Sequence, residues 1–173
     1  MKNVILIFIL IFSACTTKVE KRFISKDGEK FEATDTWEFE LNELNWAINP
    51  EFTVAKHLNG GYLNIAFTSP SKSDIISDTL TVYMNNGSSI KCNDLISTTN
   101  QDNQIIALYN LMESDISLLK LHRITRIEFS ILDRTEEASN LLADNKKEVV
   151  SYIHAAVKNN YYKTEVEISE LFK

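Results

Sequence analysis

The four glycines of this 173-residue chain all lie in three short turn motifs, which constrain the fold more than any other feature. Asn-Gly and Asp-Gly pairs supply the positive φ angles that tight hairpin turns need. The motifs are Asp27-Gly28, Asn59-Gly60-Gly61 and Asn86-Gly87. Strand-like sequence flanks each motif, at residues 19–25 and 29–34, 52–57 and 62–68, and 79–84 and 88–93. The spacing therefore predicts three β-hairpins.

Alternating apolar residues give these strands a buried face. The third hairpin shows the alternation at Leu80, Val82, Met84, Ile90 and Cys92. Between the first two hairpins the alternating residues are Trp37, Phe39 and Leu41, and then, in a shifted phase, Leu44, Trp46 and Ile48. The shift predicts a bulge or a tight turn at residues 42–43.

The second half of the chain predicts helices as well as strands. Residues 104–112 and 123–132 have strand character, and Ser114 is a suitable N-cap for a short helix that ends at Leu121. An apolar stripe predicts a longer helix over residues 136–158.

Capping residues support that longer helix. Asp133 and Glu136 resemble a capping box, and Thr135 is an alternative cap. Asp144-Asn145 could break the helix in two, and the tail at residues 161–172 could add a strand. The predicted fold class is α+β, a mainly antiparallel sheet of hairpins with about two helices packed on one face.

The first fifteen residues, MKNVILIFILIFSAC, have the pattern of a secretory signal. Lys2 precedes an apolar run at residues 4–12, which at nine residues is too short to cross a membrane. The sequence Phe12-Ser13-Ala14-Cys15 resembles the lipobox of bacterial lipoproteins, Leu-(Ala/Ser)-(Gly/Ala)-Cys, with phenylalanine at the leucine position. The resemblance implies cleavage before Cys15 and attachment of fatty acyl chains such as palmitate to this cysteine. The alternative is an ordinary signal peptide, cut near Ala14, with Cys15 left free.

The lipobox divides the chain into a signal peptide at residues 1–14, a lipid-anchored N-terminus at 15–18 and a single α+β domain at 19–173. The mature chain of 173 − 14 = 159 residues suits one domain. Residues 16–18 lack the acidic residues that, in some lipoproteins, direct retention in the inner membrane or export to the cell surface. By analogy with those lipoproteins, we expect attachment to the outer membrane on its periplasmic side.

Charge and cysteine content exclude several functions. The formal charge is −6 for the whole chain and −7 without Lys2, which argues against nucleic-acid binding and against broad attraction to anionic lipid. The two cysteines are Cys15 and Cys92. If Cys15 is lipidated, Cys92 has no disulfide partner within the chain.

No motif predicts a catalytic, metal or cofactor site. His57, His122 and His154 lack metal-ligand spacing, and the chain contains no C-x-x-C, nucleophile elbow or phosphate-binding loop. Cys92 could be a nucleophile beside a distant histidine, but its place in the alternation predicts a buried hydrophobe. Two acidic pairs, Glu136-Glu137 and Asp74/Asp78, could act as acid and base or bind calcium. Acidic residues at a protein surface are, however, more often simply solvated.

Aromatic residues are the remaining candidates for a ligand surface. Trp37 and Trp46 lie in alternating strands, so core packing is expected for them, whereas Tyr62 and Tyr83 could line a surface. Tyr161-Tyr162 in the tail are better placed for an exposed contact with a partner.

A further resemblance concerns residues 109–131, YNLMESDISLLKLHRITRIEFSI. This stretch resembles a strand–helix–strand passage of uncharacterised lipoproteins of the Bacteroidetes, and the likeness implies a fold but no activity. The predicted function is therefore a non-catalytic, lipid-anchored envelope protein that contacts the membrane through Cys15 and binds a protein or another envelope component. The alternatives are a hydrolase of unfamiliar type acting on envelope or nutrient fragments, and an immunity-type lipoprotein that neutralises an imported toxin. Nothing in the sequence indicates the oligomeric state.

Overall fold

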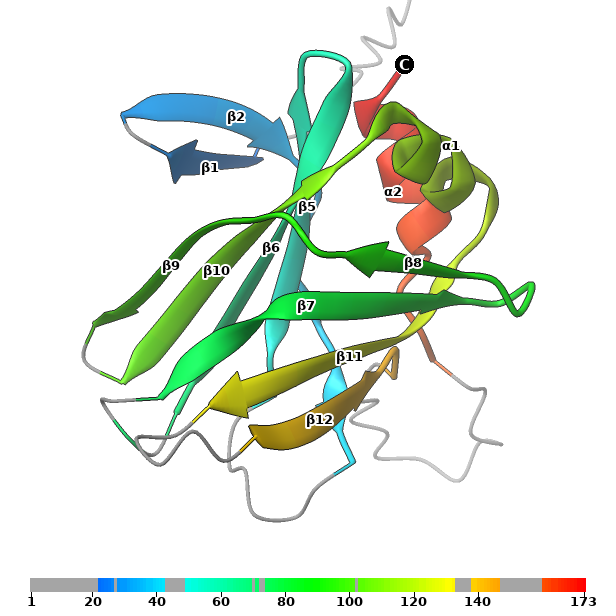
Figure 1. The fold of residues 1–173 in the computed structure, drawn as a ribbon. Coiled ribbons are helices and arrows are strands. Elements are labelled where there is room, and N and C mark those ends of the chain that lie inside the picture. Colours follow the sequence, from blue (N-terminus) through cyan, green and yellow to red (C-terminus); the bar gives the residue numbers. More distant parts are fainter. Residues whose placement is uncertain are drawn as a thin grey trace, which may run out of the picture.

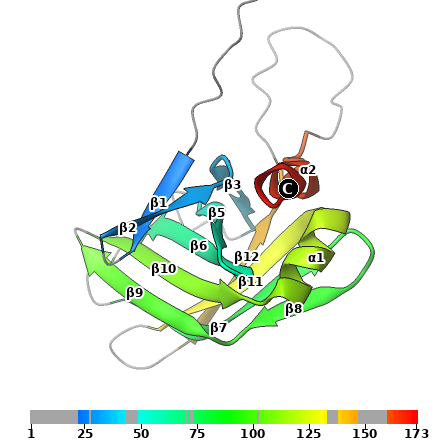
Figure 2. The same ribbon diagram turned by 90° about the horizontal axis from the view of Figure 1, so that it is seen from above.

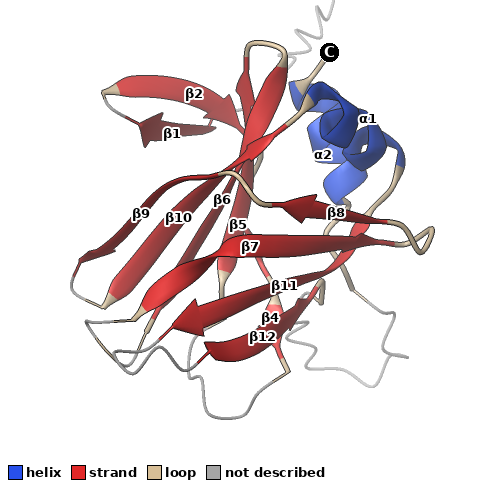
Figure 3. Ribbon diagram, in the orientation of Figure 1, coloured by secondary structure: helices blue, strands red, loops and turns tan. Residues whose placement is uncertain are grey.

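The computed structural model describes residues 22–26, 28–42, 49–69, 71, 74–101, 103–132, 138–146 and 160–173. They form two antiparallel sheets and two helices (Figures 1 and 3). The seven-stranded sheet has the order β1-β2-β5-β6-β10-β9, and β3 also pairs with β5. Its strands are β1 (Arg22–Lys26), β2 (Glu29–Ala33), β3 (Trp37–Glu38), β5 (Glu51–His57), β6 (Gly60–Thr68), β9 (Leu95–Gln101) and β10 (Gln104–Leu111). The five-stranded sheet has the order β4-β12-β11-β7-β8: β4 (Glu40–Leu41), β7 (Ile75–Met84), β8 (Ser89–Cys92), β11 (Ile124–Leu132) and β12 (Ala138–Asp144). The helices are α1 (Glu113–Leu121) and α2 (Thr164–Leu171). A mainly antiparallel fold with two helices is thus confirmed in coarse form.

The two sheets are curled and enclose one apolar core between them (Figure 2). Phe52 and Tyr109 from the seven-stranded sheet and Phe129 from the five-stranded sheet are almost completely buried in it. Each large apolar side chain so buried contributes about 1.5–3 kcal/mol relative to its exposed state. Trp37 is also fully buried, as its place in the alternation predicts.

All three predicted hairpins are present, but their glycines have different roles. Gly28 and Gly87 take φ values of +83° and +84°, as the turn motifs predict. Gly60 and Gly61 do not have positive φ; in that turn Leu58 does, at 33°. Gly60 is required by space instead, because a Cβ there would lie 2.3 Å from the carbonyl oxygen of Leu111.

We therefore expect Gly60→Ala to lower the free energy of unfolding by about 1–3 kcal/mol, since backbone atoms of β10 would have to move. Chemical denaturation monitored by circular dichroism would measure the loss. Gly28→Asn is the matched control, because asparagine tolerates positive φ and a Cβ at Gly28 meets no atom within 4 Å. Equal stabilities of the two variants would contradict this account of Gly60.

The second half differs from its predicted elements in three places. Strands β10 and β11 are confirmed, but α1 begins at Glu113 with Met112 as N-cap, so the prediction of Ser114 as the cap is wrong. The carboxylate of Asp115 accepts a hydrogen bond from the Met112 backbone N–H at 2.9 Å, which closes the first turn. The predicted extra strand in the tail is also wrong, because this segment forms α2.

The prediction of a helix over residues 136–158 is wrong for Ala138–Asp144, which is strand β12. This strand pairs with β11 from Leu132↔Ala138 to Arg126↔Asp144. Pairing places Leu141 opposite Phe129, and both side chains are buried. Tertiary pairing thus overrides the helical pattern of the sequence. Strand β9 was not predicted, since its sequence LISTTNQ is largely polar.

Several predictions concern residues outside the described ranges. They include the signal peptide, Cys15 and residues 16–18, the phase shift at Glu43 with Leu44, Trp46 and Ile48, Glu136-Glu137, the caps Asp133 and Thr135, and residues 147–158 of the predicted helix with His154.

The helices lie together at the end of the molecule that carries the β5–β6 turn (Figure 1). The Lys120 ammonium donates to the Phe172 carbonyl at 3.2 Å, and the Ser169 hydroxyl donates to the Lys120 carbonyl at 3.0 Å. Helix α2 is also joined to β3, because the Trp37 indole N–H donates to a Glu167 carboxylate oxygen at 2.9 Å. No helix within the described ranges is long and apolar enough to cross a membrane.

Candidate functional site

A β-bulge in β11 shapes the outer face of the five-stranded sheet. Ile124 pairs with Met84 and Arg126 pairs with Tyr83, so Thr125 is an extra residue in β11. Ile124 and Ile127 are buried, whereas the two residues between them are not. The bulge therefore places Thr125 and Arg126 together on the outer face, because an extra residue shifts the alternation of a strand.

Polar side chains from distant segments hold the bulge in place. The Asn145 amide donates to the Ile124 carbonyl at 2.6 Å and to the Tyr162 carbonyl at 3.0 Å, and its oxygen accepts the Tyr162 N–H at 2.8 Å. The Thr164 hydroxyl oxygen accepts the Ile124 N–H at 2.9 Å. Asn145 and Thr164 are both buried. Their side chains therefore supply hydrogen-bond partners for backbone groups that water does not reach.

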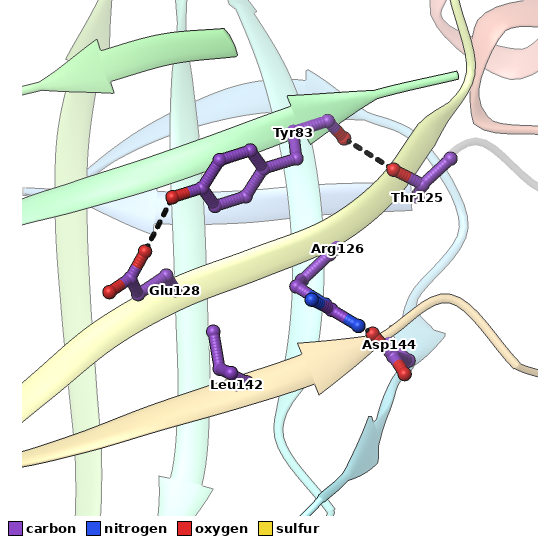
Figure 4. Close-up of a pocket in the computed structure, with 6 residues that line it drawn as sticks. All are labelled: Tyr83, Thr125, Arg126, Glu128, Leu142 and Asp144. Carbon is purple, nitrogen blue, oxygen red and sulfur yellow. Dashed lines mark hydrogen bonds and ion pairs between the residues drawn. The ribbon is translucent and has the colours of Figure 1, made fainter. Parts of the chain in front are cut away.

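A pocket of about 460 Å³ lies on the outer face beside the bulge. Its walls come from three neighbouring strands, and its residues are Tyr83 of β7, Thr125, Arg126 and Glu128 of β11, and Leu142 and Asp144 of β12 (Figure 4). The volume falls within the range of small-molecule sites. The pocket combines a phenol ring and a leucine with a guanidinium and two carboxylates, a composition suited to a polar ligand with some apolar area.

The guanidinium of Arg126 is oriented by Asp144 at one side of this pocket. Arg126 Nε donates to Asp144 Oδ1 at 2.6 Å, and the Asn42 amide donates to the other carboxylate oxygen at 3.2 Å. Burial would raise the pKa of Asp144, but these two hydrogen bonds and the positive charges of Arg126 and Lys146 together outweigh it and hold the pKa below its usual value. The carboxylate therefore stays charged at neutral pH and keeps the guanidinium in place. Within the described residues, the terminal nitrogens of Arg126 have no hydrogen-bond partner.

The Tyr83 phenol is fixed at the other side of the pocket. Its hydroxyl donates to Glu128 at 2.6 Å, and this hydrogen bond raises the pKa of Tyr83. The Thr125 hydroxyl donates to the Tyr83 backbone carbonyl at 3.1 Å. Tyr83 is thus a neutral, oriented ring. The arrangement suits recognition through charge and hydrogen bonds.

The other candidate residues that the structure describes do not line this pocket. Cys92 is buried in the core, as the alternation predicts. His57 stacks on Tyr62 at 4.8 Å between ring centroids and makes a T-shaped contact with Phe31. The Asp74 carboxylate is buried against the Ser69 hydroxyl, which corrects the expectation that it is a solvated surface acid. Tyr161 is exposed, as expected, and its ring stacks with Arg123, whose guanidinium lies 3.7 Å from the ring centroid. The expectation of an exposed contact is wrong for Tyr162, which packs against the core and stacks with Phe39.

Tyr83 is the one aromatic surface candidate that lines the pocket. Arg126 and Glu128 are recognisable in the sequence only as outward residues of an alternating strand. Their meeting with Asp144 depends on the pairing of β11 with β12, for which the sequence carries a helical pattern instead. No signal in the sequence indicates the bulge that brings Thr125 to the same face.

Burial makes Cys92 a poor nucleophile, since it raises the pKa of this thiol to about 12. We expect Cys92 in the folded protein to react with a thiol reagent such as dithionitrobenzoate at least about 100-fold more slowly than in denaturant. Labelling kinetics with and without denaturant would measure the ratio in a Cys15→Ala background, which leaves Cys92 as the only thiol. Rapid labelling of the folded protein would contradict this prediction and support a catalytic role for Cys92.

Comparisons with protein-family models, with curated proteins and with solved structures found no match to this chain.

Proposed function

We propose that this protein is a non-catalytic, lipid-anchored binding domain of the bacterial cell envelope, held at the outer membrane by acyl chains on Cys15. The pocket on the outer face of the five-stranded sheet is its recognition site. The observation that carries the proposal is the guanidinium of Arg126, which Asp144 orients while its terminal N–H groups have no hydrogen-bond partner among the described residues. Such a group binds a carboxylate or phosphate in two-point fashion. The partner is a protein or envelope component that presents one of these anions.

The groups next to Arg126 limit which partners can fit the pocket. Glu128 lies two residues from Arg126 on the same strand, so the two side chains start about 7 Å apart. The Tyr83 ring and Leu142 offer apolar area between and beside these charges. A flexible peptide segment with an anionic group and an apolar side chain fits this pattern, because such a segment can lie along the open face of the sheet.

The proposal includes the arrangement of the helices, with both packed on one face of the seven-stranded sheet. It is supported by the contacts of Gly61 in β6, where a Cβ would lie 3.0 Å from Ile116 of α1 and 3.1 Å from Phe172 after α2. In this arrangement the helices leave the outer face of the five-stranded sheet open to a partner.

A crosslinking pull-down from solubilised envelopes tests the proposed function. We expect the wild-type protein to recover a specific partner and Arg126→Ala to recover at least about 10-fold less, since arginine is a common hot spot at protein interfaces. Lys91→Ala is the matched control, because Lys91 is an exposed cation on β8 outside the pocket. Recovery of no partner across several detergents and crosslinkers, or equal recovery by both variants, would refute the proposal.

A further inference from the structure

Large exposed apolar side chains gather at one end of the molecule. Eight such side chains are exposed among the described residues, and five of them lie on the β5–β6 turn, at the start of α1 and on the two helices: Leu58, Met112, Leu118, Leu121 and Val166. We call these five residues the apolar end. Figure 1 shows the turn and both helices together, while β7 and β10, which carry Ile75 and Ile106, begin at the opposite end.

Leu58 and Met112 lie on neighbouring segments of the apolar end. Leu58 is 85% exposed and Met112 is 68% exposed. They are brought together by Gly60, whose backbone touches the Leu111–Met112 peptide so closely that a Cβ would lie 3.6 Å from the Met112 carbonyl carbon. Leu118 and Leu121 continue the surface along α1, on the side opposite the buried Ile116 and Leu119.

Two properties of Leu58 are unfavourable at a surface that contacts only water. Its side chain is almost fully exposed, and its backbone has a positive φ of 33°, a conformation in which a bulky residue is rare. Asparagine or glycine would suit both conditions better. Residues held in sparsely populated backbone conformations cluster at functional sites.

The chain leading to Cys15 leaves the domain close to this end. Arg22 pairs with Ala33, and Ala33 pairs with Ala55, so Arg22 lies about two strand spacings, or about 10 Å, from Ala55. Leu58 is three residues beyond Ala55 along β5, again about 10 Å. Arg22 is only 22 − 15 = 7 residue steps along the chain from Cys15, and seven steps can span at most about 25 Å.

The charges at this end do not form a basic surface. Lys56 and Lys120 both donate to backbone carbonyls at the end of α2, at 3.4 Å and 3.2 Å. Glu113 and Glu170 are exposed nearby. We therefore expect a contact made by this end to be mainly apolar and insensitive to salt.

We propose that the apolar end rests on the lipid bilayer that holds Cys15, with Leu58 and Met112 inserted at the level of the phospholipid headgroups and upper acyl chains. This inference rests on the proposed lipid anchor. It gives the domain a fixed orientation, in which the strand ends carrying Ile75 and Ile106 point away from the membrane.

Site-specific photocrosslinking on vesicles tests this orientation. The mature chain from Cys15 is coupled through its Cys15 thiol to a maleimide lipid in phosphatidylcholine vesicles, while the buried Cys92 does not compete. Benzoylphenylalanine replaces Leu58 or Met112 in test proteins and Ile75 or Ile106 in controls. We expect at least 10-fold more phosphatidylcholine adduct, measured by mass spectrometry, at the first two positions, and no change at 0.5 M salt.

A second variant checks that insertion itself is responsible. With the crosslinker at Leu118, the double substitution Leu58→Asn and Met112→Gln should lower the lipid adduct at least 3-fold, and asparagine at position 58 accepts the positive φ. Equal adducts at all positions, or crosslinks to a second copy in place of lipid, would overturn the proposal. Because the coupling is chemical, an unmodified Cys15 in cells would refute the anchor and leave this measurement intact.

Discussion

Replacing Cys15 by alanine is expected to move the protein from the membrane fraction to the soluble fraction almost completely. Two or more acyl chains give stable anchoring, while a protein without them has only weak contacts with the bilayer. Fractionation of cell envelopes followed by immunoblotting would measure the change, which we expect to exceed 10-fold. Mass spectrometry of the mature N-terminus should show the mass of the acyl groups on Cys15.

Cys92→Ala is the matched control for this experiment, since it removes the other cysteine of the chain. This variant should stay in the membrane fraction, although loss of the buried thiol lowers its stability. A wild-type protein with a free Cys15 thiol would contradict the lipobox and support the alternative of an ordinary signal peptide.

Replacing Asn145 by alanine is expected to lower the free energy of unfolding by about 3 kcal/mol, because buried backbone groups lose their hydrogen-bond partner. The side chain of Asn145 makes three hydrogen bonds, which join the β11 bulge to the segment before α2. For a domain of this size the melting temperature should fall by about 6–12 °C. Differential scanning calorimetry would measure it.

The bulge also positions the pocket, so Asn145→Ala should weaken partner recovery even at temperatures where the variant is folded. Asn93→Ala is the control, since Asn93 is an exposed asparagine outside both sheets. A melting temperature within 2 °C of wild type would show that the bulge is maintained by β-sheet pairing alone.

Local sequence patterns predicted the hairpins well, because turn residues and alternation act over a few neighbours. The pairs β1–β2, β5–β6 and β7–β8 follow from the three glycine motifs. The burial of Cys92 follows from its position in the alternation of β8. Strand β9 is the exception, since pairing with β10 makes a strand of a polar segment.

The functional candidates were less predictable, since each depends on residues far apart in the sequence. Arg126 meets Asp144 across a strand pair, and the β5–β6 turn meets the Leu111–Met112 peptide through the close approach of Gly60. No pattern in the neighbouring sequence predicts either contact, because each depends on the register in which strands pair.

The sequence by itself determined the strand-rich character of the chain, its three hairpins and the burial of Cys92, and it predicts an acylated Cys15. These features depend on covalent geometry, turn propensity and alternation, which are local. Only the tertiary structure decided that Ala138–Asp144 is a strand, that the tail is a helix, and that a pocket and an apolar end exist. A segment of ambiguous propensity takes the conformation that buries its apolar side chains against partners already in place, and those partners lie elsewhere in the chain.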